Sequence, residues 1–280
     1  YFALADPAIS DREYDELMGE LRKLEEAHPA LRKPDSPTER VGGDSTSDFP
    51  SRQHATPMLS LDNSYSREDV SAFDQRVRVA LPEEAVEYAA ELKIDGVALS
   101  LIYEDSLLVR AVTRGNGVQG DEVTANARTI RAVPLKLRRE GLSCEVRGEV
   151  YMSRSAFAQL NWQRAERDKP LFANPRNSTA GSLKLQNPAL VASRELRFFA
   201  YWLDMTGGEE GTHTSHLDML REVGFAVNPE HALCATLDDV FGFYDSYETR
   251  RNELDYEIDG VVIKVNDLEQ FARLGTTAKS

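Results

Sequence analysis

A lysine, Lys93, stands where a predicted β-strand meets a turn. Residues 86–95 alternate between apolar and polar side chains, which is the period-two pattern of a half-buried strand, and Gly96 follows them. A strand of this kind places Glu91, Lys93 and Asp95 on one face. A lysine in this setting is either one of three charges on a solvated face or, when it is desolvated, a nucleophile. The local pattern leaves both interpretations open.

A glycine-rich turn follows the strand predicted over residues 107–113. Arg114 opens this turn, and three glycines lie within the next six residues. Backbone N–H groups in such a turn could approach an anion. The spacing fits neither the dinucleotide-binding fingerprint nor the P-loop, because no Gly-Lys-Ser/Thr sequence follows. The turn is a weak signal by itself, since most glycine-rich turns only connect the strands of hairpins.

Two later strands carry further groups that could contact a phosphate or a sugar. Glu149 lies in a strand predicted over residues 145–152, and the strand over residues 257–265 holds a second Asp-Gly pair and a second lysine, Lys264. Each of these residues lies in or at the end of a strand, as Lys93 does. The ordered set is far more specific than any one of its members.

The first predicted element is a helix. Ser10 and Glu13 form a capping box ahead of an apolar repeat with helical spacing. Asp11, Tyr14 and Asp15 then share one side of the first turn. Acidic residues at this place are usually partners of the helix dipole, so a binding role needs support from elsewhere in the chain.

The composition is that of a globular protein without a membrane span. The 280 residues are 41% hydrophobic and 29% charged, with two cysteines too far apart for a zinc motif or a disulfide framework, which suits a reducing cytoplasm. No apolar run approaches membrane-spanning length. Strands separated by helices without strict βαβ alternation predict an α+β fold. The Pro-, Gly- and Ser-containing stretch over residues 31–50 predicts a domain boundary near Asp48.

The charge is unevenly distributed along the chain. The formal net charge of −14 argues against binding of nucleic acid through the overall field of this chain. Residues 107–184, however, contain 14 Lys and Arg against 7 Asp and Glu. This basic middle indicates one surface that faces phosphates, the alternative being chance clustering.

The complete set of motifs resembles the nucleotidyltransferase core of DNA ligases and, more narrowly, the bacterial NAD-dependent DNA ligases. The resemblance covers essentially the whole chain. The segments that carry it are residues 10–15, 57–63, 91–96, 113–117, 146–150, 172–177 and 258–265.

The resemblance implies a two-domain organisation. Residues 1–48 would form a small helical domain that binds the nicotinamide mononucleotide (NMN) half of NAD. Residues 49–280 would form a nucleotidyltransferase (adenylation) domain with antiparallel, ATP-grasp-like sheets, truncated at its C-terminal end. A last core motif with another catalytic lysine, an oligonucleotide-binding fold, a four-cysteine zinc module and a helix-hairpin-helix region would follow after Ser280.

The resemblance also implies a reaction. The lysine of the Lys-x-Asp-Gly motif, here Lys93, would attack the α-phosphorus of NAD, release NMN and keep AMP on its nitrogen. AMP would then pass to the 5′-phosphate of nicked double-stranded DNA, and the 3′-hydroxyl would displace it, as replication and repair require. The amine must be neutral to attack, although the free pKa of lysine is about 10.4. Cations such as Arg114 and Lys264 would lower the pKa of Lys93, while Glu91 and Asp95 would oppose this.

The implied binding roles follow residue by residue. Glu91 would meet the adenine, Ser60 and Leu61 would line the nucleotide site, Arg114 and Glu149 would hold the ribose and phosphate region, and Lys264 would face the phosphate. The nicotinamide half would contact Asp11, Arg12, Glu13, Tyr14, Asp15 and Tyr1. Mg²⁺ would assist through a sparse site of phosphate oxygens, water and at most one carboxylate. We expect a cytoplasmic monomer.

Two other classes of protein stay open at this stage. One is another enzyme that forms a lysine-AMP or lysine-GMP adduct, such as an ATP-dependent ligase or a capping enzyme, although residues 1–48 argue against it. The other is a non-catalytic nucleotide-binding module in which Lys93 pairs with Asp95.

Overall fold

The computed structural model describes residues 11–41, 49–205 and 211–275. Tyr1 and the predicted domain boundary near Asp48 lie outside these ranges. The side chains of Asp11, Arg12, Tyr14 and Asp15 are likewise outside what the structure describes, although their backbone is helical.

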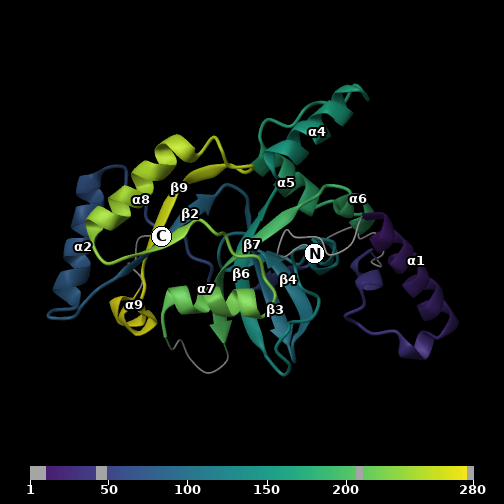
Figure 1. Cartoon of the computed structure of the whole chain (residues 1–280), viewed down its shortest axis with the longest axis horizontal. Helices are drawn as coiled ribbons and strands as arrows, with labels where there is room; N and C mark the ends of the chain where they lie inside the picture. The colour runs from purple at the N-terminus through teal and green to yellow at the C-terminus, as the bar shows by residue number, and fades with distance from the viewer. Residues whose placement is uncertain (1–10, 42–48, 206–210, 276–280) are drawn as a thin grey trace.

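Two antiparallel sheets form the body of the described chain, so the predicted α+β class is confirmed (Figure 1). Their strands are β2 (Tyr88–Ile94), β3 (Val97–Glu104), β4 (Leu107–Thr113), β6 (Cys144–Tyr151), β7 (Arg197–Met205), β8 (His231–Cys234) and β9 (Ile258–Val265). The larger sheet has the order β4-β3-β6-β7 and the smaller one the order β8-β2-β9. A short pair, β1 (Ser51–Gln53) with β5 (Gln119–Asp121), stands apart. The turn between β2 and β3 carries the chain from one sheet to the other.

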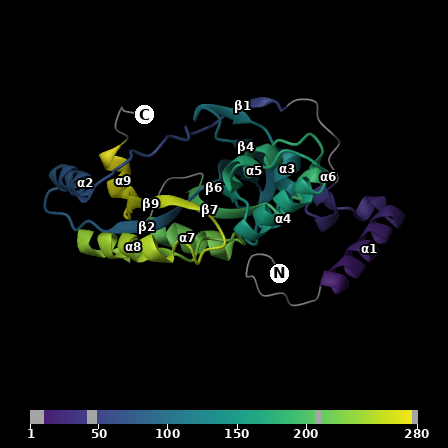
Figure 2. The same ribbon diagram turned by 90° about the horizontal axis from the view of Figure 1, so that it is seen from above.

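Helices cover the outer faces of these sheets. They are α2 (Arg67–Ala80), α3 (Thr124–Arg128), α4 (Arg154–Ala165), α5 (Pro175–Leu183), α6 (Pro188–Ala192), α7 (His213–Glu222), α8 (Leu237–Arg250) and α9 (Leu268–Leu274). α7 packs on β7, and α8 packs on the smaller sheet and on α2. Figure 2 shows α7 and α8 along one side of the molecule, while the chain between β1 and α2 crosses the opposite side.

The apolar positions of the strands build the core. Leu99, Leu101 and Val146 are fully buried in the large cluster under the four-stranded sheet, and Tyr88 and Ala90 are buried between the smaller sheet and its helices. Burial of such side chains is the main driving force for this packing.

The N-terminal segment is helical, as predicted. α1 (Asp11–Ala27) is followed by the 3-10 helices η1 (Pro29–Leu31) and η2 (Pro37–Val41). Arg40 donates hydrogen bonds to the backbone carbonyls of Arg128 (3.1 Å) and Ile130 (3.0 Å), which ties η2 to the rest of the fold. In both views α1 lies at one end of the molecule, beyond α6 and away from β2 and β9 (Figures 1 and 2).

Candidate active site

The predicted nucleophile lies at the end of β2, beside a β-bulge. Lys93 is opposite Gly260 of β9, whereas the next residue, Ile94, is opposite Ile258. Asp259 is therefore the extra residue of the bulge, and a bulge re-aims the side chain that it carries. The Asp259 carboxylate accepts a hydrogen bond of 2.8 Å from Lys93 Nζ. About two fifths of each side chain is exposed, so the pair lies at a surface open to ligand.

The turn after Lys93 depends on a glycine for close packing. A Cβ atom on Gly96 would lie 2.2 Å from the carbonyl oxygen of Val150 in β6 and 2.9 Å from the side chain of Glu149. Any larger residue would push the β2–β3 turn away from β6. Gly96 therefore keeps Lys93 and Glu149 close together.

A second ion pair lies next to the first. Arg176, in the first turn of α5, has its guanidinium 2.8 Å from the carboxylate of Asp95 and 3.8 Å from that of Asp259. Asn174 caps this helix by accepting a hydrogen bond of 2.8 Å from the backbone N–H of Asn177. Lys93 thus pairs with Asp259 and not with Asp95, which differs from the pairing expected for the non-catalytic module.

Glu149 completes this end of the site. The carboxyl group is partly buried, and burial raises its pKa to about 8 although Arg176 and Lys93 act in the opposite direction. The group is therefore largely protonated at neutral pH in the free protein. A protonated carboxyl can donate as well as accept a hydrogen bond, which suits contact with ribose hydroxyls.

Replacement of Glu149 with glutamine is expected to change how stability depends on pH. Between the ordinary value near 4.5 and the folded value near 8, the folded state holds a proton that the unfolded state has released. The free energy of unfolding of the unmodified protein therefore falls as pH rises through this window, and glutamine removes the effect. Melting temperatures at pH 5 and pH 8 should show an advantage of the variant that grows with pH. An advantage that is equal at both pH values would contradict a raised pKa for Glu149.

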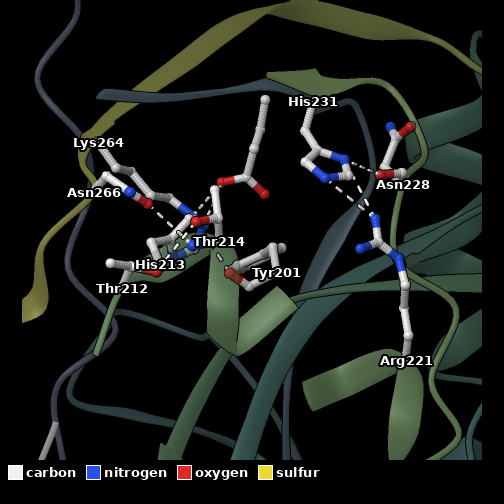
Figure 3. Close-up of polar contacts among 10 residues, drawn as sticks. Tyr201, Thr212, His213, Thr214, Arg221, Asn228, His231, Lys264 and Asn266 are labelled. Atoms are coloured by element: carbon white, nitrogen blue, oxygen red, sulfur yellow. Dashed lines mark hydrogen bonds and ion pairs between the residues drawn. The ribbon is translucent and has the colours of Figure 1, made fainter. Parts of the chain in front are cut away.

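A buried ion pair occupies the other end of the same strand pair. Glu91 is 8% exposed, and its Oε1 lies 2.7 Å from Lys264 Nζ and 2.7 Å from His213 Nε2. Burial alone would raise the pKa of Glu91, but Lys264 and His213 together bring it down to about 2. Lys264 also lies 3.4 Å from the carbonyl oxygen of Tyr201 and over the tyrosine ring (Figure 3). The expectation of a solvated strand face is therefore wrong at Glu91.

Lys264 does not lie beside Lys93. Lys264 is opposite Ala89, and Gly260 is opposite Lys93, so the two lysines are separated by four positions along the strand pair, or about 13 Å. Lys264 therefore pairs with Glu91, which was expected to meet the adenine. It does not adjoin Lys93, which was expected to attack the phosphate. Arg114 contacts a different segment of the chain. Its Nε donates a hydrogen bond of 3.1 Å to the carbonyl of Met58.

Residues 56–58 are fixed over the large sheet and lead directly to Ser60 and Leu61. Arg147 donates hydrogen bonds to the carbonyls of Thr56 (2.6 Å) and Pro57 (3.2 Å), and the N–H of Met58 donates to the carbonyl of Gly117 (2.8 Å). Ser60 and Leu61 themselves are exposed. The glycine-rich turn thus holds this segment through its backbone.

Three residues of the site were not assigned a role from the sequence. Asp259 and Arg176 belong to the recognised motifs, and their contacts with Lys93 and Asp95 follow only from the bulge and from α5. His213 belongs to none of those motifs and is the first residue of α7. Thr212 caps α7 through the N–H of Ser215, and this capping box is the signal that could have placed the helix start correctly.

The described side chains do not form a metal-binding cluster by themselves. Within residues 11–41, 49–205 and 211–275, no group of three or more His, Cys, Asp and Glu side chains could hold one. Asp95 and Asp259 each pair with a cation already. Mg²⁺ commonly keeps water ligands and binds through one or two carboxylates plus the phosphates of a substrate. The donor set fits that kind of sparse site.

None of the helices in the described ranges has the length and apolar character that crossing a membrane requires.

Two family models match consecutive parts of the chain. Residues 46–280 match the family model of the NAD-dependent DNA ligase adenylation domain, and residues 1–42 match that of the DNA ligase-like N-terminal NAD+-binding domain. The chain is 50% identical over 281 residues to the DNA ligase of Desulforamulus reducens and, over the same length, 50% identical to that of Carboxydothermus hydrogenoformans. All of this chain and 42% of each relative are covered.

Among solved structures, the chain is similar to mycobacterial DNA ligase D complexed with ATP and MES, with 16% identity and a TM-score of 0.37 over 65% of this chain and 49% of that one. The ATP-dependent DNA ligase of bacteriophage T7 in complex with ATP gives 12% identity and a TM-score of 0.39 over 76% of this chain and 65% of that one. Similarity at this level is too low to carry an argument.

The extent of the family match makes residues 46–280 an adenylation domain of the nucleotidyltransferase class. The chain belongs to the NAD-dependent DNA ligase family, and it spans about two fifths of the length of the curated relatives that it matches.

Proposed function

We propose that this chain transfers AMP from NAD to its own Lys93. The observation that carries the proposal is the arrangement along β2 and β9. A lysine held by Asp259 stands at the open end, and a buried carboxylate, Glu91, stands two residues away on the same face, or about 7 Å along the strand. In this proposal Lys93 is the group that reacts with phosphate and Glu91 the group that recognises the base, and their separation supports the binding of one nucleotide by both.

The proposed reaction exchanges one bond to phosphorus for another. Lys93 Nζ, after loss of a proton, forms a bond to the α-phosphorus of NAD. The bond from that phosphorus to the bridging oxygen breaks, and NMN leaves with the electron pair. Asp259 orients Nζ through the hydrogen bond that it accepts, and Arg176, close to both Asp95 and Asp259, supplies positive charge where the phosphate oxygens would lie.

The opposite end of the site is proposed to bind the base. Glu91 offers an acceptor and Lys264 offers a donor on the same face of the β2–β9 pair, which complements the amino group and ring nitrogen of adenine. We therefore assign Lys264 to the adenine end and not to the phosphate. Glu149 is proposed to contact the ribose, and Arg114 holds the segment that leads to Ser60 and Leu61, which would line the nucleotide site.

The remaining assignments are parts of the same proposal. The nicotinamide half is proposed to contact Asp11, Arg12, Glu13, Tyr14, Asp15 and Tyr1. Because α1 lies away from β2 in the structure, this role requires the N-terminal segment to approach Lys93. Mg²⁺, held by one carboxylate such as Asp259 together with phosphate oxygens, would neutralise phosphate charge.

We further propose that the adenylated lysine serves the joining of nicked double-stranded DNA in the longer protein, because the matched relatives carry the name DNA ligase. The basic residues between 107 and 184 would support contact with DNA phosphates. We propose that the protein acts as a monomer in the cytoplasm, a reducing compartment that suits the buried free thiols of Cys144 and Cys234.

Incubation with NAD or with ATP, followed by intact-mass measurement, tests the proposed function. NAD should add one AMP to the chain, because its N-terminal residues are proposed to hold the nicotinamide half, and ATP should add none. An adduct from ATP alone would favour the ATP-dependent class instead.

Variants of the first helix extend this test. Asp11→Ala and Tyr14→Ala should slow adduct formation from NAD strongly while leaving the binding of AMP unchanged. Equal losses of both activities would remove the nicotinamide role from α1.

A further inference from the structure

A buried histidine supports the carboxylate at the adenine end. His213, the first residue of α7, is 1% exposed, and its Nε2 lies 2.7 Å from Glu91 Oε1 (Figure 3 shows the surrounding contacts). The same nitrogen is 3.1 Å from Lys264 Nζ. Two nitrogen atoms, one from His213 and one from Lys264, thus converge on one carboxylate oxygen.

The protonation states follow from charge and burial. The pKa of Glu91 near 2 makes it an anion at neutral pH. Burial and the nearby Lys264 lower the pKa of His213, so the imidazole is neutral. A carboxylate can only accept, so the 2.7 Å contact assigns the single ring proton to Nε2, which donates it to Glu91. The longer approach of Lys264 Nζ to the same nitrogen, at 3.1 Å, then joins two donors and is not a hydrogen bond.

This arrangement leaves the two oxygens of Glu91 in different situations. Oε1 accepts from both His213 and Lys264. Oε2 takes part in none of the hydrogen bonds among the residues that the structure describes. The carboxylate therefore offers one oriented oxygen to a ligand, and rotation of the group would break two contacts.

The backbone around His213 is fixed to the strand that carries Lys264. The N–H of His213 donates to the carbonyl of Asn266 (2.6 Å), and the N–H of Thr214 donates to Asn266 Oδ1 (3.1 Å). The imidazole also stacks on Trp202 with ring centroids 6.1 Å apart. Figure 3 shows His213, Asn266 and Lys264 gathered on one side of this network.

A second histidine lies near Glu91, but its side chain contacts other residues. His231 is directly opposite Glu91 in the pairing of β2 with β8. Its ring contacts the carbonyl of Asn228 (2.9 Å) and the guanidinium of Arg221, as Figure 3 shows. Of these two histidines, His213 is the one in hydrogen-bond contact with the carboxylate.

We propose that His213 is a positioning residue that sets the base specificity of this site. By holding Oε1, it keeps Oε2 of Glu91 as an acceptor for the exocyclic amino group of adenine, and it does not touch the ligand itself. Hypoxanthine carries an oxygen at that position, so an oriented carboxylate repels it, whereas a carboxylate free to rotate discriminates less. This inference rests on the proposed function.

The test compares NAD with nicotinamide hypoxanthine dinucleotide as donors in adduct formation. The phenylalanine variant His213→Phe keeps a ring against Trp202 and removes the donor. We expect the preference for NAD to fall roughly tenfold, the effect of one hydrogen bond to a charged group. His213→Gln, whose amide can donate, should retain part of the preference, and the control His231→Gln should retain all of it. An unchanged ratio in His213→Phe would overturn the inference.

Equilibrium binding separates this inference from the proposed reaction. AMP and IMP are titrated into the same variants by calorimetry, because binding needs no chemistry. Absence of an adduct in the unmodified chain, together with a His213-dependent preference for AMP, would reject the proposed reaction and support the positioning role. Equal preference for AMP in the unmodified chain and His213→Phe would reject the positioning role.

Discussion

Replacement of Lys93 with alanine should abolish formation of the AMP adduct from NAD. The bond to phosphorus needs an amine at this position, and alanine leaves no nucleophile in its place. Because adduct formation is a covalent step, the loss should be complete within the detection limit of intact-mass measurement. The fold should persist, since the ion pair with Asp259 is about two fifths exposed on both sides and such pairs contribute little to stability.

Lys93→Arg is the sharper version of this experiment. Arginine keeps a positive charge that can pair with Asp259 but does not lose its proton at accessible pH, so it cannot attack phosphorus. The arginine variant should therefore be as inactive as the alanine variant. Lys136→Ala, which removes an exposed lysine paired with Glu140, provides the matched control and should form the adduct normally. An AMP-sized mass increase in Lys93→Ala would show that the nucleophile lies elsewhere.

The sequence alone was sufficient to predict the strand that carries the lysine. The strand predicted over residues 86–95 is confirmed by β2, which spans Tyr88–Ile94, and the turn at Gly96 by the passage of the chain from one sheet to the other. These features are local, so residue type and spacing determine them. The α+β class is also confirmed, because each strand shows its own pattern, whereas the antiparallel pairing was expected from the resemblance to a family.

The partners of the charged residues could not be predicted from such patterns. Asp259 reaches Lys93 because of a one-residue bulge, which shifts the pairing of β9 against β2 after Gly260. His213 reaches Glu91 across 122 positions of sequence. Contacts of this range depend on how sheets and helices pack, and alternation within one strand carries no information about them. The same holds for Lys264, whose register opposite Ala89 brings its side chain to Glu91.

The burial of Glu91 also depends on packing from both sides. Alternation suggested a solvated face for the charged residues of β2, but α7 and β9 bring His213 and Lys264 over that face. A side chain that is buried in this way stays charged only when it is paired and hydrogen-bonded. The pairing therefore has consequences for stability as well as for binding.

Replacement of Glu91 with glutamine should weaken both the fold and the nucleotide site. Lys264, with a side chain 14% exposed, would lose its counterion, and breaking a buried pair from one side costs roughly 3–5 kcal/mol. Adduct formation from NAD should fall by about a hundredfold or more, because the acceptor for the base is no longer charged or held. Urea unfolding at pH 7 and adduct kinetics at limiting NAD measure the two effects.

The effect of Glu91→Gln on stability should depend on pH in a defined direction. The folded pKa of Glu91 near 2 lies below its ordinary value near 4.5. The stabilisation from the carboxylate is therefore fully present above about pH 4.5 and is lost as pH falls towards 2. Unfolding of the two proteins should differ most at neutral pH and converge in acid, whereas a difference that does not change with pH would contradict the lowered pKa.

A double variant separates the two roles of the pair. Glu91→Gln combined with Lys264→Met removes the unpaired buried charge, and replacement of both partners of a buried ion pair is often close to neutral for stability. The double variant should therefore regain most of the stability lost in Glu91→Gln while adduct formation stays low, because neither the acceptor nor the donor for the base is present. Recovery of both properties together would mean that the pair only stabilises the fold, and adenine recognition would then have to come from other residues.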